Sequence, residues 1–366
     1  MATIGRRGLV TAISGLAAST VASAPGSWRT PNCRRVPRPY LRGVSSSCDE
    51  VGNKWRRPAA GTSDTCDPSG IKYYAARAKK AADSDNFYAV AATYNQFAVA
   101  ESLVLADKDG GSEAASAACA KLCAGRLPLM TANAFVEGVR RRPLHSTVRD
   151  DGSMATEEEA ASALWADAIS SGFNLCEAMI ARDLADGGRG AAEVMLCVIA
   201  RSGVYAGSVG RGRIVVGTEE NGDIWCDEAS CPHLPSSEAE MQRIDELMLE
   251  GAGAGDNLPE GQPTRFLGGG VLKERDSRYI GLPDIVRLDH VANSRRFVII
   301  GSSGIWSYGP RLPVQWAIEA YRSGRSPADE LISRSTGSDD VVLVLILPPK
   351  VAEGSTLPPH HEIVLN

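Results

Sequence analysis

The chain has 366 residues, of which 43% are hydrophobic and 23% charged, and its formal net charge is −5. These values are typical of a globular protein and exclude wholesale disorder, collagen and coiled coil. No uncharged stretch is apolar enough to cross a bilayer, because the longest, residues 8–28, is diluted by Ser, Thr and Gly. The acidic balance disfavours nucleic-acid binding through a generally basic surface.

The charge is unevenly distributed along the chain. Residues 1–60 hold ten Lys and Arg against two acidic residues, a net of +8, which leaves −13 for the remainder. We therefore predict a basic targeting segment or tail over residues 1–69, a folded domain over 70–350 and a C-terminal tail over 351–366. A short apolar stretch after Arg6 and Arg7 resembles a secretory signal. The Arg-rich stretch that continues to Ser47 resembles a mitochondrial or plastid transit peptide, so an organellar location is expected. The alternative is a basic tail on a cytoplasmic protein.

Nine cysteines in a chain of this size do not indicate a disulfide framework. Cys176 and Cys197 lie in apolar runs and are predicted to be buried thiols. Cys226, Cys231 and His233 form one metal-like cluster, but no second ligand pair has the spacing of a structural zinc site. A surface loop is therefore expected there.

The first half of the folded part is predicted to be rich in helices. A strand is expected at residues 87–90, Ala-rich helices at 98–105 and 114–124, and a loop region around 140–152. A long helix then begins at the capping box formed by Thr156 and Glu159. One face of that helix carries a stripe predicted to be buried, Trp165, Ile169, Phe173, Cys176 and Ile180.

The second half changes to strands and paired helices. The expected elements are a strand meander at 194–200, 205–209, 213–218 and 223–226, a helix at 238–249, Gly-rich loops at 251–261 and 268–270, a strand at 297–300, helices at 312–322 and 327–333, and a buried strand at 341–347. Without regular βαβ alternation, this order favours an α+β layered domain.

Several separated segments resemble one family, the metal-dependent type-2C Ser/Thr protein phosphatases (PPM-type). Gly203-Val-Tyr-Ala-Gly-Ser-Val-Gly210-Arg-Gly-Arg213 is similar to its G-x-L-Y-V-A-N-V-G-D-S-R hairpin, and Phe297-Val-Ile-Ile-Gly-Ser-Ser303-Gly304-Ile-Trp306 to F-L-I-L-A-S-D-G-L-W-D. Gly337-Ser-Asp-Asp340-Val-Val-Leu-Val344 is similar to G-S-x-D-N-I-T-V. The resemblance implies two antiparallel β-sheets between helix pairs.

The same resemblance implies a degenerate metal site. Family members hold two divalent cations with several carboxylates, and these ions activate the attacking water. At the matching positions this chain has Ala92 and Thr93 for the bridging Asp and its Gly, Tyr94 for the general-acid His, Arg211, Gly269 and Ser303 for three further Asp residues, and Asp340 as the one retained acid. No catalytic residue and no metal cofactor are therefore expected.

Arg211 adds a positive charge at an acid position. We expect it to pair with Asp340 or, with Arg213, to hold a phosphate or carboxylate. The leading hypothesis is an inactive family member, a pseudophosphatase, that acts as a scaffold or regulatory subunit through protein partners, in a larger assembly. Two alternatives stay open. One is a residual Mg²⁺- or Mn²⁺-dependent phosphatase with substitute ligands among Asp85, Asp339, Asp340, Glu193 and Asp284, and the other is a phosphopeptide reader that does not hydrolyse.

Overall fold

The computed structural model describes residues 72–77, 88–93, 96–105, 113–142, 156–184, 189–200, 203–220, 222–249, 257–289, 294–336 and 340–347. The predicted segments 1–69 and 351–366 lie outside these residues. None of the helices in the described ranges is both long and apolar enough to cross a membrane.

Two antiparallel sheets form the centre of the fold. The first sheet has the order β1 (Lys72–Arg77), β11 (Val341–Leu347), β10 (Arg295–Gly301), β6 (Arg213–Glu220) and β7 (Asp223–Glu228). The second has the order β2 (Tyr88–Thr93), β3 (Gln96–Leu103), β4 (Ala191–Ala200), β5 (Gly203–Val209) and β9 (Asp284–Asp289), with β8 (Leu267–Gly268) beside β4. Apolar side chains from both sheets form one core between them, as expected for a β-sandwich.

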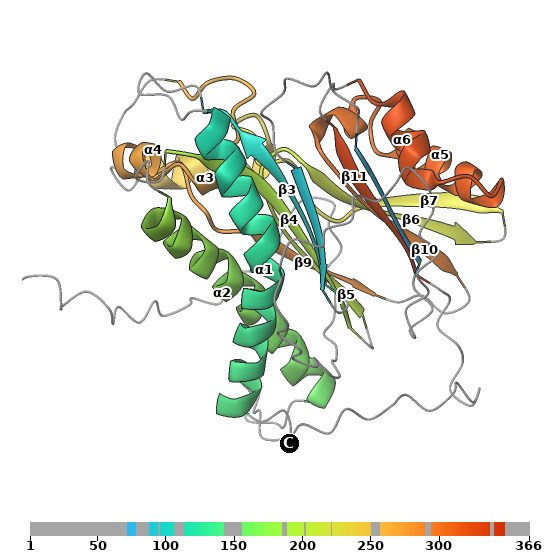
Figure 1. Ribbon diagram of the computed structural model, residues 1–366, viewed down its shortest axis with the longest axis horizontal. Coiled ribbons are helices and arrows are strands. Elements are labelled where there is room, and N and C mark those ends of the chain that lie inside the picture. The colour runs from blue at the N-terminus through green and yellow to red at the C-terminus, as the bar shows by residue number, and fades with distance from the viewer. Residues whose placement is uncertain are drawn as a thin grey trace, which may run out of the picture. The chain divides into compact units, whose positions relative to one another are not determined.

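Helices cover the outer face of each sheet (Figure 1). The long helices α1 (Glu113–Arg141) and α2 (Glu157–Asp183) share a core with the second sheet. The shorter helices α5 (Arg311–Arg322) and α6 (Pro327–Arg334) share a core with the first sheet. Helices α3 (Glu238–Leu249) and α4 (Gly270–Arg275) and the 3₁₀ turn η2 (Ser303–Trp306) lie in the connections. The predicted α+β class, two antiparallel sheets between helix pairs, is confirmed.

The predicted start of α2 is confirmed in atomic detail. The Thr156 side chain accepts a hydrogen bond from the Glu159 backbone N–H, and the Glu159 carboxylate accepts one from the Thr156 backbone N–H. All five residues of the predicted stripe are buried, and Trp165 stacks on Phe135 of α1 with ring centroids 4.2 Å apart. Cys176 and Cys197 are fully buried, as predicted.

Two expected local structures were wrong. Residues 98–105, expected as a helix, lie mostly in strand β3, which is buried along nearly its whole length between β2 and β4. An apolar run of this length suits a buried strand as well as a helix, and pairing on both sides decides it. Helix α1 does not end near residue 124 but continues through Pro128 to Arg141, into the expected loop around 140–152, because its packing on α2 and the sheet outweighs the hydrogen bond lost at Pro128.

The strands of the expected meander are divided between the two sheets. Strands β4 and β5 belong to the second sheet, and β6 and β7 to the first. The turn at Gly210 therefore carries the chain from one sheet to the other, at one end of the sandwich. The expected loop at residues 268–270 holds the end of β8 and the start of α4.

The close packing of α2 on β5 generates a stability prediction. A Cβ at Gly207 would lie 2.6 Å from Cγ2 of Ile169, whereas a Cβ at Gly125 on the exposed face of α1 would meet no atom within 4 Å. We expect Gly207→Ala to lower the free energy of unfolding by about 1–3 kcal/mol through overpacking. Gly125→Ala should raise it by about 0.5–1 kcal/mol through helix propensity. Urea unfolding of both variants measures the difference, and Gly207→Ala as stable as Gly125→Ala would contradict this packing.

Candidate functional site

Two carboxylates extend the core between the sheets toward one end of the sandwich. Strand register places Glu101 of β3 directly opposite Glu193 of β4. Side chains alternate along a strand, so both share the face of Val99 and Met195, which belong to the core between the sheets. The Glu193 side chain is only 2% exposed. Glu101 is half-buried, and a carboxylate as deeply buried as Glu193 requires a nearby positive charge.

Arg211 supplies that charge from the turn between β5 and β6. Its backbone N–H and its side-chain Nε donate to the two carboxylate oxygens of Glu193, at 2.5 and 2.6 Å. Gly210 has a φ of 111°, and a Cβ there would lie 2.6 Å from the Cβ of Glu193, so the turn requires glycine at this position. Burial alone would lower the pKa of the Arg211 guanidinium, but the Glu193 carboxylate outweighs it, and the pKa is raised above its usual value.

The expected pairing of Arg211 with Asp340 is thus replaced by a pairing with Glu193. Arg213, the other arginine expected to bind phosphate, donates from Nη1 to Glu228 at 2.7 Å. Both guanidinium groups therefore already hold a carboxylate, and a phosphate would have to share or displace it. The sequence signal for this arrangement was Glu193 itself, an acid inside the apolar strand Ala-Ala-Glu-Val-Met-Leu.

Asp340 is held by a separate set of hydrogen bonds. Its Oδ1 accepts from the Ser302 hydroxyl at 2.7 Å and from the Gly304 backbone N–H at 3.2 Å, and the side chain is buried. The Ser302 hydroxyl in turn accepts from the Val341 backbone N–H at 3.0 Å. The Asp340 carboxylate thus joins the start of β11 to the turn after β10. Ser303, predicted to occupy a former metal position, is exposed.

Ala92 and Thr93 lie away from these acids. Ala92 pairs with Phe97 and Thr93 with Gln96, at the end of β2 and the start of β3. Phe97 pairs with Cys197, four residues along β4 from Glu193, which is a distance of roughly 13 Å. The structure brings Glu101 to the end of the sandwich that holds Glu193. In the sequence, this acid follows a short apolar run, Phe97-Ala-Val-Ala, and precedes Ser102. Glu101 was not among the predicted site residues, because residues 98–105 were expected to form a helix.

The described donor groups do not fit a pair of divalent cations. Both oxygens of Glu193 bind N–H groups of Arg211, and Oδ1 of Asp340 accepts two further hydrogen bonds. Within the described ranges, no three His, Cys, Asp or Glu side chains are grouped so that they could hold a metal ion. A dication bound at Glu193 would have to displace the Arg211 donors from its carboxylate oxygens.

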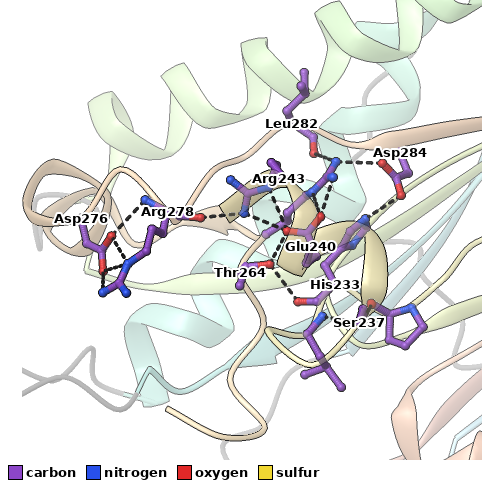
Figure 2. Close-up of polar contacts among 12 residues, drawn as sticks. His233, Ser237, Glu240, Arg243, Thr264, Asp276, Arg278, Leu282 and Asp284 are labelled. Carbon is purple, nitrogen blue, oxygen red and sulfur yellow. Dashed lines mark hydrogen bonds and ion pairs between the residues drawn. The ribbon is translucent and has the colours of Figure 1, made fainter. Parts of the chain in front are cut away.

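A second buried cluster lies around His233, Glu240 and Asp284 (Figure 2), and it also contacts the β5–β6 turn. The Gly210 backbone N–H donates to Nδ1 of His233 at 3.2 Å, and Nε2 of the same ring lies 3.1 Å from Oδ2 of Asp284. The other oxygen of Asp284 accepts from Arg265 at 2.8 Å, and Arg265 also donates to Glu240 of α3. Arg211's turn is therefore anchored on the side away from Glu193 as well.

This cluster corrects the expectation of a surface loop at residues 226–233. His233 is 2% exposed, its Nδ1 accepts a hydrogen bond and its Nε2 lies 3.1 Å from a carboxylate oxygen of Asp284, while Cys226 and Cys231 are half-buried. The imidazole ring lies between the Gly210 backbone amide and the Asp284 carboxylate.

Burial and ion pairing act in opposite directions on the acids of the cluster. Burial alone would raise the pKa of Glu240, but hydrogen bonds from Arg265, Arg243 and Thr264 lower it to about 2. Burial would likewise raise the pKa of Asp284, and His233 and Arg265 lower it to about 2. Both carboxylates therefore stay ionised in the folded protein at all but strongly acidic pH.

Comparisons with known proteins agree with this architecture. Residues 136–336, more than half of the chain, match the family described as Protein phosphatase 2C. The crystal structure of serine-threonine phosphatase 2C from Toxoplasma gondii is similar, with a TM-score of 0.54 and 17% identity over 75% of this chain and 94% of that chain. A sex determining protein of C. elegans has a TM-score of 0.49 and 16% identity over 76% of this chain and 65% of that chain. No curated protein matches this sequence.

The lowered pKa values of Glu240 and Asp284 predict a specific loss of stability in acid. A carboxyl whose folded pKa lies below its unfolded value contributes stability that is complete above about pH 5 and is lost as the pH falls toward 2. Each group should account for about 2–3 kcal/mol of that loss. We expect Asp284→Asn to be less stable at pH 7 and to lose less on acidification.

Urea unfolding at pH 7, 5 and 3 measures this dependence. The exposed Glu260→Gln serves as the matched control and should follow the wild type at each pH. If Asp284→Asn and the wild type lost equal stability between pH 5 and pH 3, the ion pairs would not be the source of the acid sensitivity.

Proposed function

Because this chain belongs to the protein phosphatase 2C family, we propose that it is an inactive member that works by binding a protein partner as a scaffold or regulatory subunit. The fold keeps both sheets and both helix pairs, whereas the acids at the end of the sandwich are engaged with the chain's own donors. A protein that functions by binding a partner through its surface needs the fold of the family but not the metal-binding acids, so these acids can pair with the chain's own donors.

The observation that carries this proposal is the pair formed by Glu193 and Arg211. Dinuclear hydrolysis needs carboxylates whose oxygens face a cation, since two ions must activate water and hold the phosphoryl group. Here the Arg211 guanidinium neutralises the buried acid through one short hydrogen bond from Nε, and the Arg211 backbone N–H donates a second to the other carboxylate oxygen. Its raised pKa means that no accessible pH removes the charge.

Two other functions remain as alternatives to this proposal. Residual metal-dependent phosphatase activity is favoured by Glu101, which adds a carboxylate that sequence analysis had overlooked, beside Glu193. Binding of a phosphopeptide without hydrolysis is favoured by Arg211, whose side chain is 32% exposed and so reaches solvent while it holds Glu193. The organellar location expected from residues 1–69 also remains a proposal, and N-terminal sequencing of the mature chain tests it.

Replacing Arg211, whose guanidinium neutralises Glu193, tests the leading proposal directly. We expect the full-length wild type to hydrolyse neither p-nitrophenyl phosphate nor a phosphothreonine peptide with millimolar Mn²⁺. Arg211→Asp frees Glu193 and adds a third carboxylate, so it should bind Mn²⁺ at least about tenfold more tightly than the wild type. Isothermal titration calorimetry measures the affinity, and thermal unfolding with and without Mn²⁺ reports whether the variant is folded.

Two control variants separate charge from shape. Arg211→Lys keeps the positive charge and should bind Mn²⁺ no more tightly than the wild type, and Glu193→Gln combined with Arg211→Asp should lose most of the gain. Wild-type turnover that Asp340→Ala or Glu101→Gln abolishes would refute inactivity and favour the residual phosphatase. A phosphopeptide that binds the wild type but not Arg211→Glu would favour the reader.

A further inference from the structure

Strand β7 presents an uncovered surface at the edge of the first sheet. Within the described residues it is the last strand in the order of that sheet and pairs with β6. On the face directed toward the second sheet, Val216 and Thr218 of β6 are buried, whereas Trp225, paired with Thr218, is 60% exposed. The covering layer therefore ends before β7 and leaves a large aromatic side chain in solvent.

Two acids flank this tryptophan on the same face. Asp223 and Asp227 lie two residues before and after Trp225, so the alternation of a strand places all three side chains together, and both aspartates are exposed. An open strand edge with such a face can accept an additional strand, whose own side chains must be complementary in charge and shape.

The chain itself contains a matching sequence. Residues 36–42 read Val-Pro-Arg-Pro-Tyr-Leu-Arg, and Arg38, Tyr40 and Arg42 recur at the same spacing of two. If this segment is extended, the three side chains share one face, where an Arg–Tyr–Arg row would oppose the Asp–Trp–Asp row. Aromatic pairs and opposite charges are both favourable across neighbouring strands.

The two prolines suit an edge position. Pro37 and Pro39 are two residues apart, so their missing N–H groups would both point to the same side of an extended strand. The alternate residues, including Arg38 and Tyr40, would offer their N–H groups to the other side. A strand of this kind can pair with one neighbour and then ends the sheet, because its outer side lacks donors.

The connection is long enough for this docking. The described part of the chain begins with β1, at the opposite edge of the same sheet. Strand β1 lies four strand spacings from β7, which is roughly 19 Å. Residues 43–71 join the segment to β1 and reach up to roughly 95 Å when extended. A tethered segment also has a high effective concentration at the edge.

We propose that residues Val36–Arg42 of this chain add a strand to the open edge of β7, with Tyr40 against Trp225 and Arg38 and Arg42 against Asp223 and Asp227. The basic N-terminal part thereby covers the acidic edge of the folded domain. The docking does not depend on whether the phosphatase site is active, but it requires a chain that keeps residues 36–42, so it applies to the uncleaved form that the experiment below uses.

Hydrogen–deuterium exchange on the full-length chain tests the docking. We expect the backbone amides of β7 to exchange about tenfold faster in Arg38→Glu/Arg42→Glu than in the wild type, because the added strand is lost. Adding Asp223→Arg and Asp227→Arg to that variant should restore slow exchange by swapping the charges. Arg56→Glu/Arg57→Glu makes the same change in net charge outside the segment and should leave β7 unchanged.

Three results would overturn the proposal. The first is equal exchange of β7 in the wild type and in Arg38→Glu/Arg42→Glu. The second is equal acceleration in the Arg56→Glu/Arg57→Glu control, which would indicate a general charge effect. The third is protection that disappears on dilution as the molecular mass halves, which would place the segment of a second copy on β7 instead.

Discussion

The bond between Glu193 and Arg211 is the constraint on which the site end of this protein depends. An ionised carboxylate that is 2% exposed is tolerable only with a fixed counter-charge, and here one residue supplies both a backbone and a side-chain donor. That arrangement requires the turn to approach β4 closely, which only glycine at position 210 allows. The same turn therefore carries the chain from one sheet to the other and neutralises the buried acid.

The cluster around His233 supports the same turn from its other side. A backbone amide of Gly210 is joined through the imidazole to Asp284, and from there through Arg265 to Glu240 on α3. Partnered buried charges of this kind are costly to break singly, because each removal leaves another charge unpaired. The turn is thus held between two ionic groups with little freedom to open.

Much of the architecture could be predicted from the sequence because its signals are local. Buried strands such as 341–347 and the capping box at Thr156 depend on neighbouring residues alone. Strand β3 was mistaken for a helix because a short Ala-rich apolar run has no decisive period, and pairing with distant strands determines its form.

The site was harder to predict than the fold for the same physical reason. The partner of Arg211 is set by the register of β4 against β5, and the position of Glu101 by the register of β3 against β4. A shift of one residue would turn either acid to the helix-covered face, so motif spacing along the chain cannot identify these contacts. An isolated Glu in an apolar strand was the signal available, since such a residue needs a partner.

The buried sulfur atoms have a consequence of a different kind. Burial raises the pKa of Cys176 to about 12, and that of Cys197 is raised even without a charged neighbour. Both groups therefore remain neutral thiols that fill space in the layers on either side of the second sheet, and thiolate chemistry with alkylating reagents or oxidants is suppressed. The rate at which an added alkylating reagent modifies Cys176 and Cys197 therefore reports how often those two layers open.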